Sequence, residues 1–319
     1  MHHDVTQFGT IGVLMGGYSS ERDISLKSGR AVYQALKEAG CRVSGLDILF
    51  REEKEILSFL KEAKIDVAFI ALHGSLGEDG TIQTILEELA IPYSGSGVEA
   101  SRQAINKIQT QTILKRENIP VAEHVIVKNG LGSDGRDLRR ILRHLSFPVV
   151  VKPAAQGSSI GVTLVDREEN LKGALKTALR YGPEALVERC IPGREFTVGI
   201  LGEEVLPVIE LCPKNRFFDF EAKYQPGMTD YIVPARVPLP VSRALQDAAW
   251  GAHRALGCRD LSRVDIMMDD DENPYVLEVN TIPGFTQTSL LPKAALAAGV
   301  NFVQLCLRLV GMAYGKKKK

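Results

Sequence analysis

The sequence predicts an α/β protein whose first part surrounds a parallel sheet and whose later parts are α+β. Two strand-like apolar runs, residues 11–15 and 67–72, alternate with helical stretches at 25–39 and 81–89. Alternating strands and helices are typical of βαβ units, in which the strands lie parallel. After residue 100 short strands outnumber helices, which favours mixed layers over a continued parallel sheet.

Each element of the first part has its own signal. Residues 11–15 form an uninterrupted apolar run of strand length, and Gly16 follows in a turn. The helix at 25–39 carries apolar side chains at helical spacing and ends at Gly40, a typical C-cap residue. The helix at 81–89 likewise has one apolar face. We therefore expect a Rossmann-like first domain.

Two turn-rich segments, 94–97 and 191–193, divide the chain into three predicted domains. The predicted limits are 1–100 for an N-terminal α/β domain, 101–189 for a small central α+β domain, and 190–319 for a C-terminal α+β domain. In the later domains we expect a helix carrying Ile105 to Ile113, helices at 170–179 and after Ser242 and Ser289, and strands at 121–127, 148–152, 161–165, 185–188, 196–201, 205–210, 262–269 and 274–280.

The composition excludes several classes of protein. The 319 residues balance 39 basic against 39 acidic side chains, so no basic surface predicts nucleic-acid binding. The five cysteines form no CxxC pair, which predicts free thiols in a reducing compartment. No apolar run is long enough to span a bilayer, and the polar start does not resemble a secretory signal. We expect a cytoplasmic protein without membrane contact, with the run Lys316 to Lys319 forming a solvated tail; contact with an acidic surface is the alternative.

The most specific local pattern is a pair of polar side chains on each of two neighbouring strands. Arg263 and Asp265 share one face of their strand, and Glu278 and Asn280 share one face of the next, because side chains alternate. The Asp-rich segment between them is typical of a turn, so a hairpin would join both pairs into one wall. Two carboxylates and an amide oxygen suit Mg²⁺ or Mn²⁺, with nucleotide phosphates completing the coordination. An ordinary solvated hairpin face is the alternative.

A loop rich in glycine and serine runs from Lys152 to Gly161 between two predicted strands. Glycines let backbone N–H groups approach phosphate closely, and the hydroxyls of Ser158 and Ser159 add donors. Lys152 ends its strand, where its ammonium could reach phosphate oxygens. The loop is not a Walker A motif, because no GK[ST] triplet follows and the next element is a strand. A plain hairpin turn is the alternative.

Three further segments lie where open α/β sheets bind ligands. Glu21 could neutralise a substrate ammonium, although an acidic residue in a first helical turn also stabilises the helix by itself. His73 follows the second strand, where it could contact the substrate; a structural histidine is the common alternative. Ser289 and Leu290 open a helix whose N–H groups can bind a carboxylate, and Ser289 can also serve as N-cap. No GxGxxG pattern follows the first strand, which argues against a dehydrogenase.

Together these stretches resemble the D-alanine–D-alanine ligase family over nearly the whole chain. The matching stretches are, in order, GGYSSERDISLKSG, ALHGSLGEDGTIQ, YSGSGVEAS, VVVKPAAQGSSIGV, FFDFEAKY, SRVDIMM and VLEVNTIPGFTQTSLLP. The resemblance implies a three-domain ATP-grasp fold with ATP between the central and C-terminal domains. It implies ATP-dependent joining of two D-alanines to D-alanyl-D-alanine through an acyl phosphate, for peptidoglycan synthesis, and a homodimer.

The resemblance also implies roles for single residues. Lys107 and Lys152 would bind phosphate, Lys223 would close over it from a lid, and Glu188 and Glu195 would line the adenine and ribose pocket. The two Mg²⁺ or Mn²⁺ ions would be held by Asp265, Glu278 and Asn280. On the amino-acid side, Glu21 would bind the ammonium of the first D-alanine, with Ser158 and Tyr224 as its hydrogen-bonded partners. Arg263 and the Gly284 N–H would stabilise the oxyanion. Ser289 and Leu290 would bind the carboxylate of the second D-alanine.

The segment 217–230 mixes aromatic and polar residues without periodicity, and we expect it to close over the acyl phosphate and exclude water.

The sequence departs from the family pattern at Asn106, where aspartate is frequent, and at 154–156, where more polar residues are frequent. The alternatives are a relative that joins D-alanine to D-serine or D-lactate, and a non-catalytic ATP-binding module on the same fold. Tyr224 argues against the lactate-forming relatives, and the full set of charged residues argues against the module.

Overall fold

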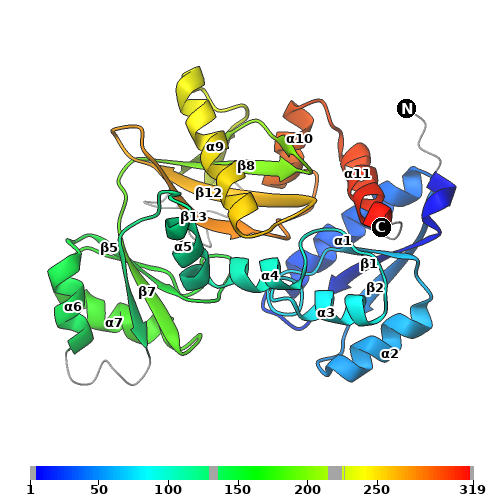
Figure 1. Ribbon diagram of the computed structural model, residues 1–319, viewed down its shortest axis with the longest axis horizontal. Helices are drawn as coiled ribbons and strands as arrows, with labels where there is room; N and C mark the ends of the chain where they lie inside the picture. The colour runs from blue at the N-terminus through cyan, green and yellow to red at the C-terminus, as the bar shows by residue number, and fades with distance from the viewer. Residues whose placement is uncertain (1–4, 129–135, 215–224, 226, 317–319) are drawn as a thin grey trace.

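The computed structural model describes residues 5–128, 136–214, 225 and 227–316. The strands of this described part form three β-sheets (Figure 1). The first sheet is parallel, in the order β2-β1-β3. Every residue of β3 is buried, as expected of a parallel strand covered on both faces. The parallel sheet predicted at the N-terminus is therefore confirmed. Its elements are η1 (Val5–Phe8), β1 (Thr10–Gly16), α1 (Arg22–Glu38), β2 (Arg42–Ile48), α2 (Glu53–Ala63), β3 (Val67–Ile70) and α3 (Thr81–Glu88).

The central sheet is antiparallel, in the order β4-β7-β5-β6. Its elements are β4 (His124–Lys128), α6 (Arg136–His144), β5 (Val149–Pro153), β6 (Thr163–Val165), α7 (Glu168–Ala178) and β7 (Glu184–Arg189). Burial alternates along β5, so Val149 and Val151 enter a core with Leu171 of α7. The intervening Val150 and Lys152 therefore point to the other face of the sheet.

The third sheet follows the path β11-β10-β8-β12-β13, with β9 paired to β8. Helix α9 crosses β8, β12 and β13, and α4 and α5 also pack on β13. Although α4 and α5 precede the central sheet in the sequence, Ala104 and Leu114 thus lie in the core of the third sheet with Phe196 and Val264. The elements are α4 (Val98–Ile105), α5 (Lys107–Arg116), β8 (Arg194–Leu201), β9 (Glu204–Val205), β10 (Ile209–Pro213), β11 (Thr229–Ile232), α9 (Leu239–Ala255), β12 (Leu261–Met268) and β13 (Pro274–Asn280).

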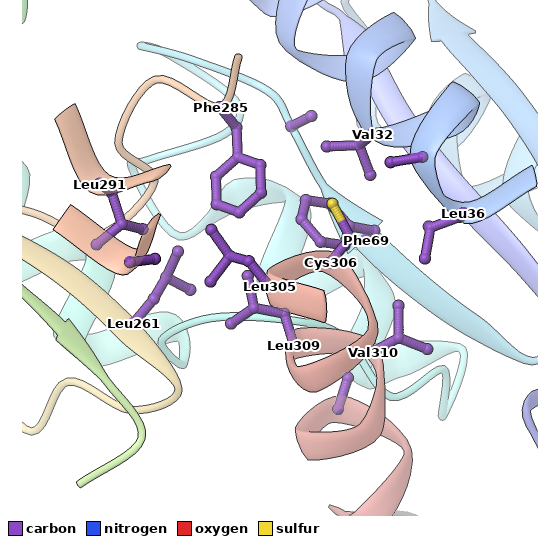
Figure 2. Packing of buried hydrophobic residues seen from close by; sticks show 14 of the residues in the cluster. Val32, Leu36, Phe69, Leu261, Phe285, Leu291, Leu305, Cys306, Leu309 and Val310 are labelled. Carbon is purple, nitrogen blue, oxygen red and sulfur yellow. The ribbon is translucent and has the colours of Figure 1, made fainter. Parts of the chain in front are cut away.

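The last two helices, α10 (Leu290–Ala297) and α11 (Phe302–Gly315), join the first and third sheets into one core. Figure 2 shows Leu305 and Leu309 of α11 packed beside Phe285, and the rings of Phe285 and Phe69 contact each other with centroids 5.3 Å apart. An Asn301–Gln304 capping box begins α11. Within the described residues no single helix has the length and apolar character to span a membrane, and only α10 and α11 together, bent by 102°, meet that test.

Three expectations from the sequence are wrong. The single helix through Ile105 and Ile113 is broken at Asn106, whose extended backbone and side-chain acceptor cap α5. The strand expected at 205–210 is two strands, because β9 ends before a loop and β10 starts at Ile209. Lys316 is not part of a fully solvated tail, since its Nζ donates to Tyr93 O at 3.0 Å and pairs with the carboxylate of Asp260. The domain limits at 100 and 189 stay a prediction.

Candidate active site

A cavity of about 540 Å³ lies between the central sheet and the third sheet, where the family resemblance leads us to expect ATP, and we call it the nucleotide cavity. Strands β5 and β7 turn Val150, Lys152 and Glu188 toward it, while their neighbours fill the core. Strands β8, β10, β12 and β13 supply the facing wall, which includes Glu195, Leu211, Asp265, Met267, Leu277 and Glu278. A cleft therefore lies opposite the strand that carries Lys152.

Lys152 is almost wholly buried in this cavity and forms an ion pair with Glu188 of β7. Glu188 is 2 % exposed and also accepts a hydrogen bond from the amide of Gln111 on α5, a residue that the sequence analysis did not single out. Burial by itself lowers the pKa of Lys152, but Glu188, Glu278 and Glu195 raise it above its ordinary value. The ammonium therefore keeps its charge inside the protein, which suits a group that binds phosphate.

Lys107 brings a second cation to the same cavity from the start of α5. Its Nζ lies 3.1 Å from Glu278 Oε2 and donates to Gln156 O at 2.7 Å. Its backbone N–H donates to Ala154 O at 2.8 Å. Lys107 thus ties α5 both to β13 and to the loop that follows Lys152.

The loop after β5 has a backbone conformation that L-residues rarely adopt. Ser158 and Ser159 have φ of +52° and +58°, and Gly161 has φ of +75°. A left-handed residue other than glycine costs ~1–2 kcal/mol, and such strain gathers at ligand sites. Ile160 N donates to Gly157 O at 3.1 Å and closes a tight turn. Ser159 lines the nucleotide cavity and Ser158 lines a second cavity, so one strained turn serves both.

Strands β12 and β13 form the predicted wall, in the register Arg263 opposite Asn280 and Asp265 opposite Glu278. Arg263 donates two hydrogen bonds to Asp265, at 2.8 and 2.7 Å. Asp265 also accepts from Thr197 Oγ1 at 2.6 Å and from Asn280 Nδ2 at 3.2 Å. These donors fix the carboxylate, and through it the guanidinium of Arg263.

The wall carries the types of oxygen donor that bind a magnesium ion, and Asp265 would bind one by giving up one of the four hydrogen bonds it accepts. Asp265 and Glu278 are cross-strand neighbours, and the amide of Asn280 directs its nitrogen to Asp265, which leaves its oxygen on the other side of the amide group. Mg²⁺ is typically bound by one or two carboxylates together with substrate phosphates. Within the described residues no cluster of three or more His, Cys, Asp or Glu side chains could hold a metal ion. In a site of this kind, phosphate oxygens and water complete the coordination.

The second cavity, of about 320 Å³, adjoins the first, and Glu278 lines both. We call it the amino-acid cavity. Glu21 at the start of α1 accepts a hydrogen bond from Ser158 Oγ, which joins the first sheet to the strained loop. A Cβ added to Gly157 would lie 2.9 Å from Glu21 Oε2, so the glycine lets this loop approach the carboxylate without displacing it. Glu21 and Ser158, predicted as partners, thus meet inside this cavity.

His73 connects three segments at the same cavity. Its Nδ1 lies 3.0 Å from Ile282 O and its Nε2 lies 3.1 Å from Ser28 Oγ. Ser28 Oγ accepts from Phe285 N at 3.1 Å, so its hydroxyl proton can point to Nε2. We assign the tautomer with the proton on Nδ1, on the basis of these partners. His73 therefore fixes the segment 282–285 that carries Gly284.

Glu78 is a buried carboxyl of the amino-acid cavity that the sequence analysis did not single out. Its Oε1 lies 3.6 Å from His73 Nδ1. Burial raises the pKa of Glu78, the contact with His73 opposes this, and Glu21 and Glu278 raise it further. In the sequence, the only signal for Glu78 is its position five residues after His73. Glu78 is easily overlooked because it belongs to a Gly-Glu-Asp-Gly run, which is typical of turns. The next residue, Asp79, does serve the turn, by accepting from Thr81 N at 3.0 Å.

The start of α10 borders the amino-acid cavity, where Gly284, Ser289 and Leu290 line it with Arg263. Ser289 occupies the N-cap position without a side-chain capping bond. Its hydroxyl instead accepts from Thr286 N at 3.0 Å and stabilises the turn before the helix. Lys223, Tyr224 and most of the predicted lid at 217–230 lie outside the described residues.

Comparisons with known proteins place the chain among ligases. Family models described as D-ala D-ala ligase N-terminus and D-ala D-ala ligase C-terminus match residues 49–96 and 113–311. The chain belongs to the D-alanine–D-alanine ligase family. A D-alanine–D-alanine ligase of Pelotomaculum thermopropionicum is 47% identical over 309 residues, which cover 95% of this chain and 96% of that protein. One from Geotalea uraniireducens is 46% identical over 303 residues, 95% of each chain.

Solved structures of the D-alanine–D-alanine ligase family share the fold. A D-alanine–D-alanine ligase from Bacillus anthracis complexed with ATP has a TM-score of 0.84 and 32% identity, and covers 97% of this chain and 98% of that one. The VanG D-Ala:D-Ser ligase from Enterococcus faecalis has a TM-score of 0.82 and 29% identity, with 95% and 99% covered. The predicted ATP-grasp fold is confirmed.

Proposed function

We propose that this chain joins two D-alanine molecules into D-alanyl-D-alanine while ATP becomes ADP and phosphate. The observation that carries the proposal is that the nucleotide cavity and the amino-acid cavity meet at Glu278. The first presents two lysines to a polyphosphate, and the second presents Glu21 to an ammonium. The names of the relatives and the ATP bound by the Bacillus anthracis protein support the same assignment.

In the first step the carboxylate of one D-alanine attacks the γ-phosphorus of ATP and forms an acyl phosphate. Glu21, held by Ser158, binds the ammonium of this D-alanine and so orients its carboxylate. Lys107 and Lys152 offset the charge on the phosphates. Phosphoryl transfer depends mainly on positioning and charge stabilisation, and these residues supply both.

In the second step the amine of the other D-alanine attacks the acyl carbon, and phosphate leaves. Arg263, held in place by Asp265, and the backbone N–H of Gly284 stabilise the oxyanion, a role typically worth ~3 kcal/mol for one donor. The start of α10 at Ser289 and Leu290 binds the carboxylate of the second D-alanine.

Two Mg²⁺ or Mn²⁺ ions belong to this proposal, with Asp265, Glu278 and Asn280 as the residues that would hold them. When bound, such ions neutralise the charge on the transferred phosphoryl group. The use of the product in peptidoglycan, a cytoplasmic setting and a homodimer are further parts of the proposal that rest on the family.

A phosphate-release assay on the purified chain tests the proposal, with D-alanine, with L-alanine and without amino acid. We expect ATP turnover and dipeptide only with D-alanine. Nucleotide binding without phosphate release in the presence of D-alanine would instead indicate a non-catalytic module. The similarity to VanG makes D-serine a second candidate for the incoming amine, so D-alanine, D-serine and D-lactate are compared in competition.

A further inference from the structure

The hydroxyl of Ser28 on α1 joins three segments of the chain at the wall of the amino-acid cavity. Ser28 is buried, its Oγ lies 3.1 Å from His73 Nε2, and the same Oγ accepts from Phe285 N at 3.1 Å. With the proton of His73 on Nδ1, Ser28 donates to Nε2, so its one hydroxyl acts as donor and as acceptor. None of the proposed steps of the reaction uses Ser28.

The hydrogen bonds of Ser28 and His73 hold both ends of the short segment that carries Gly284. His73 Nδ1 lies 3.0 Å from Ile282 O at one end, and Ser28 Oγ holds Phe285 N at the other. Gly284 lies between these two contacts and lines the amino-acid cavity. Because the peptide groups on either side are held, the N–H of Gly284 has a fixed direction before a ligand binds.

Apolar packing places Phe285 but does not orient its backbone. The ring of Phe285 packs against Phe69 and Phe302 at centroid distances of 5.3 and 5.7 Å, and Figure 2 shows it inside the core. The hydrophobic effect has no direction, whereas a hydrogen bond orients the peptide group that makes it. The bond to Ser28 therefore fixes an orientation that the ring contacts leave open.

The start of α10, where the second carboxylate is proposed to bind, has support of its own. Ser289 Oγ accepts from Thr286 N at 3.0 Å and lies 2.8 Å from Thr286 Oγ1. A change at Ser28 should therefore disturb the direction of the Gly284 N–H more than the binding of the second D-alanine.

We propose that Ser28 is a positioning residue for the second step of the reaction, and that it aims the Gly284 N–H at the oxyanion through its bonds to Phe285 N and His73. The inference deepens the proposed function and rests on it, because it takes Gly284 as a donor to that oxyanion. Ser28 then matters for the attack of the amine on the acyl carbon. Formation of the acyl phosphate depends instead on Glu21 and the two lysines.

The test replaces Ser28 with alanine in the full chain and measures two rates in one mixture of Mg-ATP and D-alanine. ATP that carries heavy oxygen in its β–γ bridge reports the reversible formation of the acyl phosphate, because the end phosphate of bound ADP rotates before the phosphoryl group returns. The appearance of dipeptide reports the second step.

For Ser28→Ala we expect the kcat of dipeptide formation to fall about ten- to hundredfold, the usual effect of a misplaced catalytic group, with little change in the KM for the second D-alanine. The ratio of isotope exchange to dipeptide formation should rise, because a slower second step lets the acyl phosphate return to ATP more often. A general loss of structure would lower both rates and would not raise this ratio.

The matched control is Ser25→Ala. Ser25 lies about one turn earlier on α1 and is equally buried, and its Oγ also serves two partners, Gly16 N at 2.8 Å and Ala71 O at 2.7 Å. It lines neither cavity. Ser25→Ala should lower the melting temperature about as much as Ser28→Ala and leave both rates near those of the unaltered chain. Ser28→Cys keeps a weak donor and acceptor and should retain more of the kcat than Ser28→Ala.

Two results would overturn this inference alone. One is an unchanged ratio of exchange to dipeptide formation in Ser28→Ala, or in Ser28→Cys where the alanine variant does not fold. The other is an equal loss of kcat in Ser25→Ala and Ser28→Ala. An unaltered chain that forms no dipeptide would overturn the proposed function, and this inference with it.

Discussion

Replacing Arg263 with lysine tests the oxyanion role most directly. Arg263 holds Asp265 with two hydrogen bonds of 2.8 and 2.7 Å and lines the amino-acid cavity. Lysine keeps the positive charge but cannot reproduce a planar pair of donors. The substitution therefore separates the geometry of the guanidinium from its charge.

The size of the effect follows from the contacts. Loss of one well-placed oxyanion donor costs ~3 kcal/mol in the transition state, which is about a hundredfold in kcat. Asp265 keeps its bonds from Thr197 Oγ1 at 2.6 Å and Asn280 Nδ2 at 3.2 Å, and lysine can still pair with it. We therefore expect a stability loss of only about 1–2 kcal/mol, the scale of one hydrogen bond to a charged group. Arg263→Ala, which removes the partner of a buried carboxylate, should cost about 3 kcal/mol.

The assay measures dipeptide formation under saturating substrates together with thermal unfolding. The matched control is Arg22→Lys, because Arg22 also donates two bonds of 2.8 Å to one carboxylate, Asp47, but lines neither cavity. We expect little change in either measurement for the control. If Arg263→Lys retained a kcat within threefold of the unaltered chain, the oxyanion role would be refuted.

Three further predictions concern buried charges. Lys152→Met should weaken ATP binding in a direct titration and should cost about 3 kcal/mol in unfolding experiments, because Glu188 loses its cation; unchanged nucleotide affinity would contradict the phosphate role. Because folding raises the pKa of Glu78, the folded state binds the extra proton, so stability should fall as the pH rises from 4.5 toward the raised value, and Glu78→Gln should abolish that fall in melting curves. Lys316→Met should cost about 2 kcal/mol, against about 0.5 or less for the exposed Arg308→Met, and equal values would show that the Lys316 contact is not stabilising.

The local patterns of the sequence predicted the strands and their polar faces well. The alternation around Arg263 and Glu278 was enough to predict a hairpin wall, because strand periodicity and turn chemistry are local properties. Glu21 and Ser158 could be paired only through the family resemblance. Glu21 caps α1 and Ser158 lies in the loop after β5, and no spacing in the sequence predicts that they meet.

What the sequence did not reveal depends on long-range packing. The break at Asn106 has a local signal, since asparagine is a common N-cap, but apolar residues on both sides imitate one continuous helix. Lys316 looks like part of a solvated tail until α11 packs against the first sheet and brings its ammonium to Asp260. In the sequence Glu78 resembles a turn residue. Only the folded structure shows that it is buried beside His73, where burial raises the pKa of its carboxyl group.

Among the described residues, three of the cations that line the two cavities already have a carboxylate partner. Lys152 pairs with Glu188, Lys107 with Glu278, and Arg263 with Asp265. These pairs hold the cations in fixed positions, which reduces the reorganisation needed when a ligand binds. They also offset the positive charge, so the three cations alone do not balance a nucleotide triphosphate. Under the proposed function we therefore expect additional positive charge to accompany ATP, and the divalent ions proposed for the oxygen donors of the wall would supply part of it.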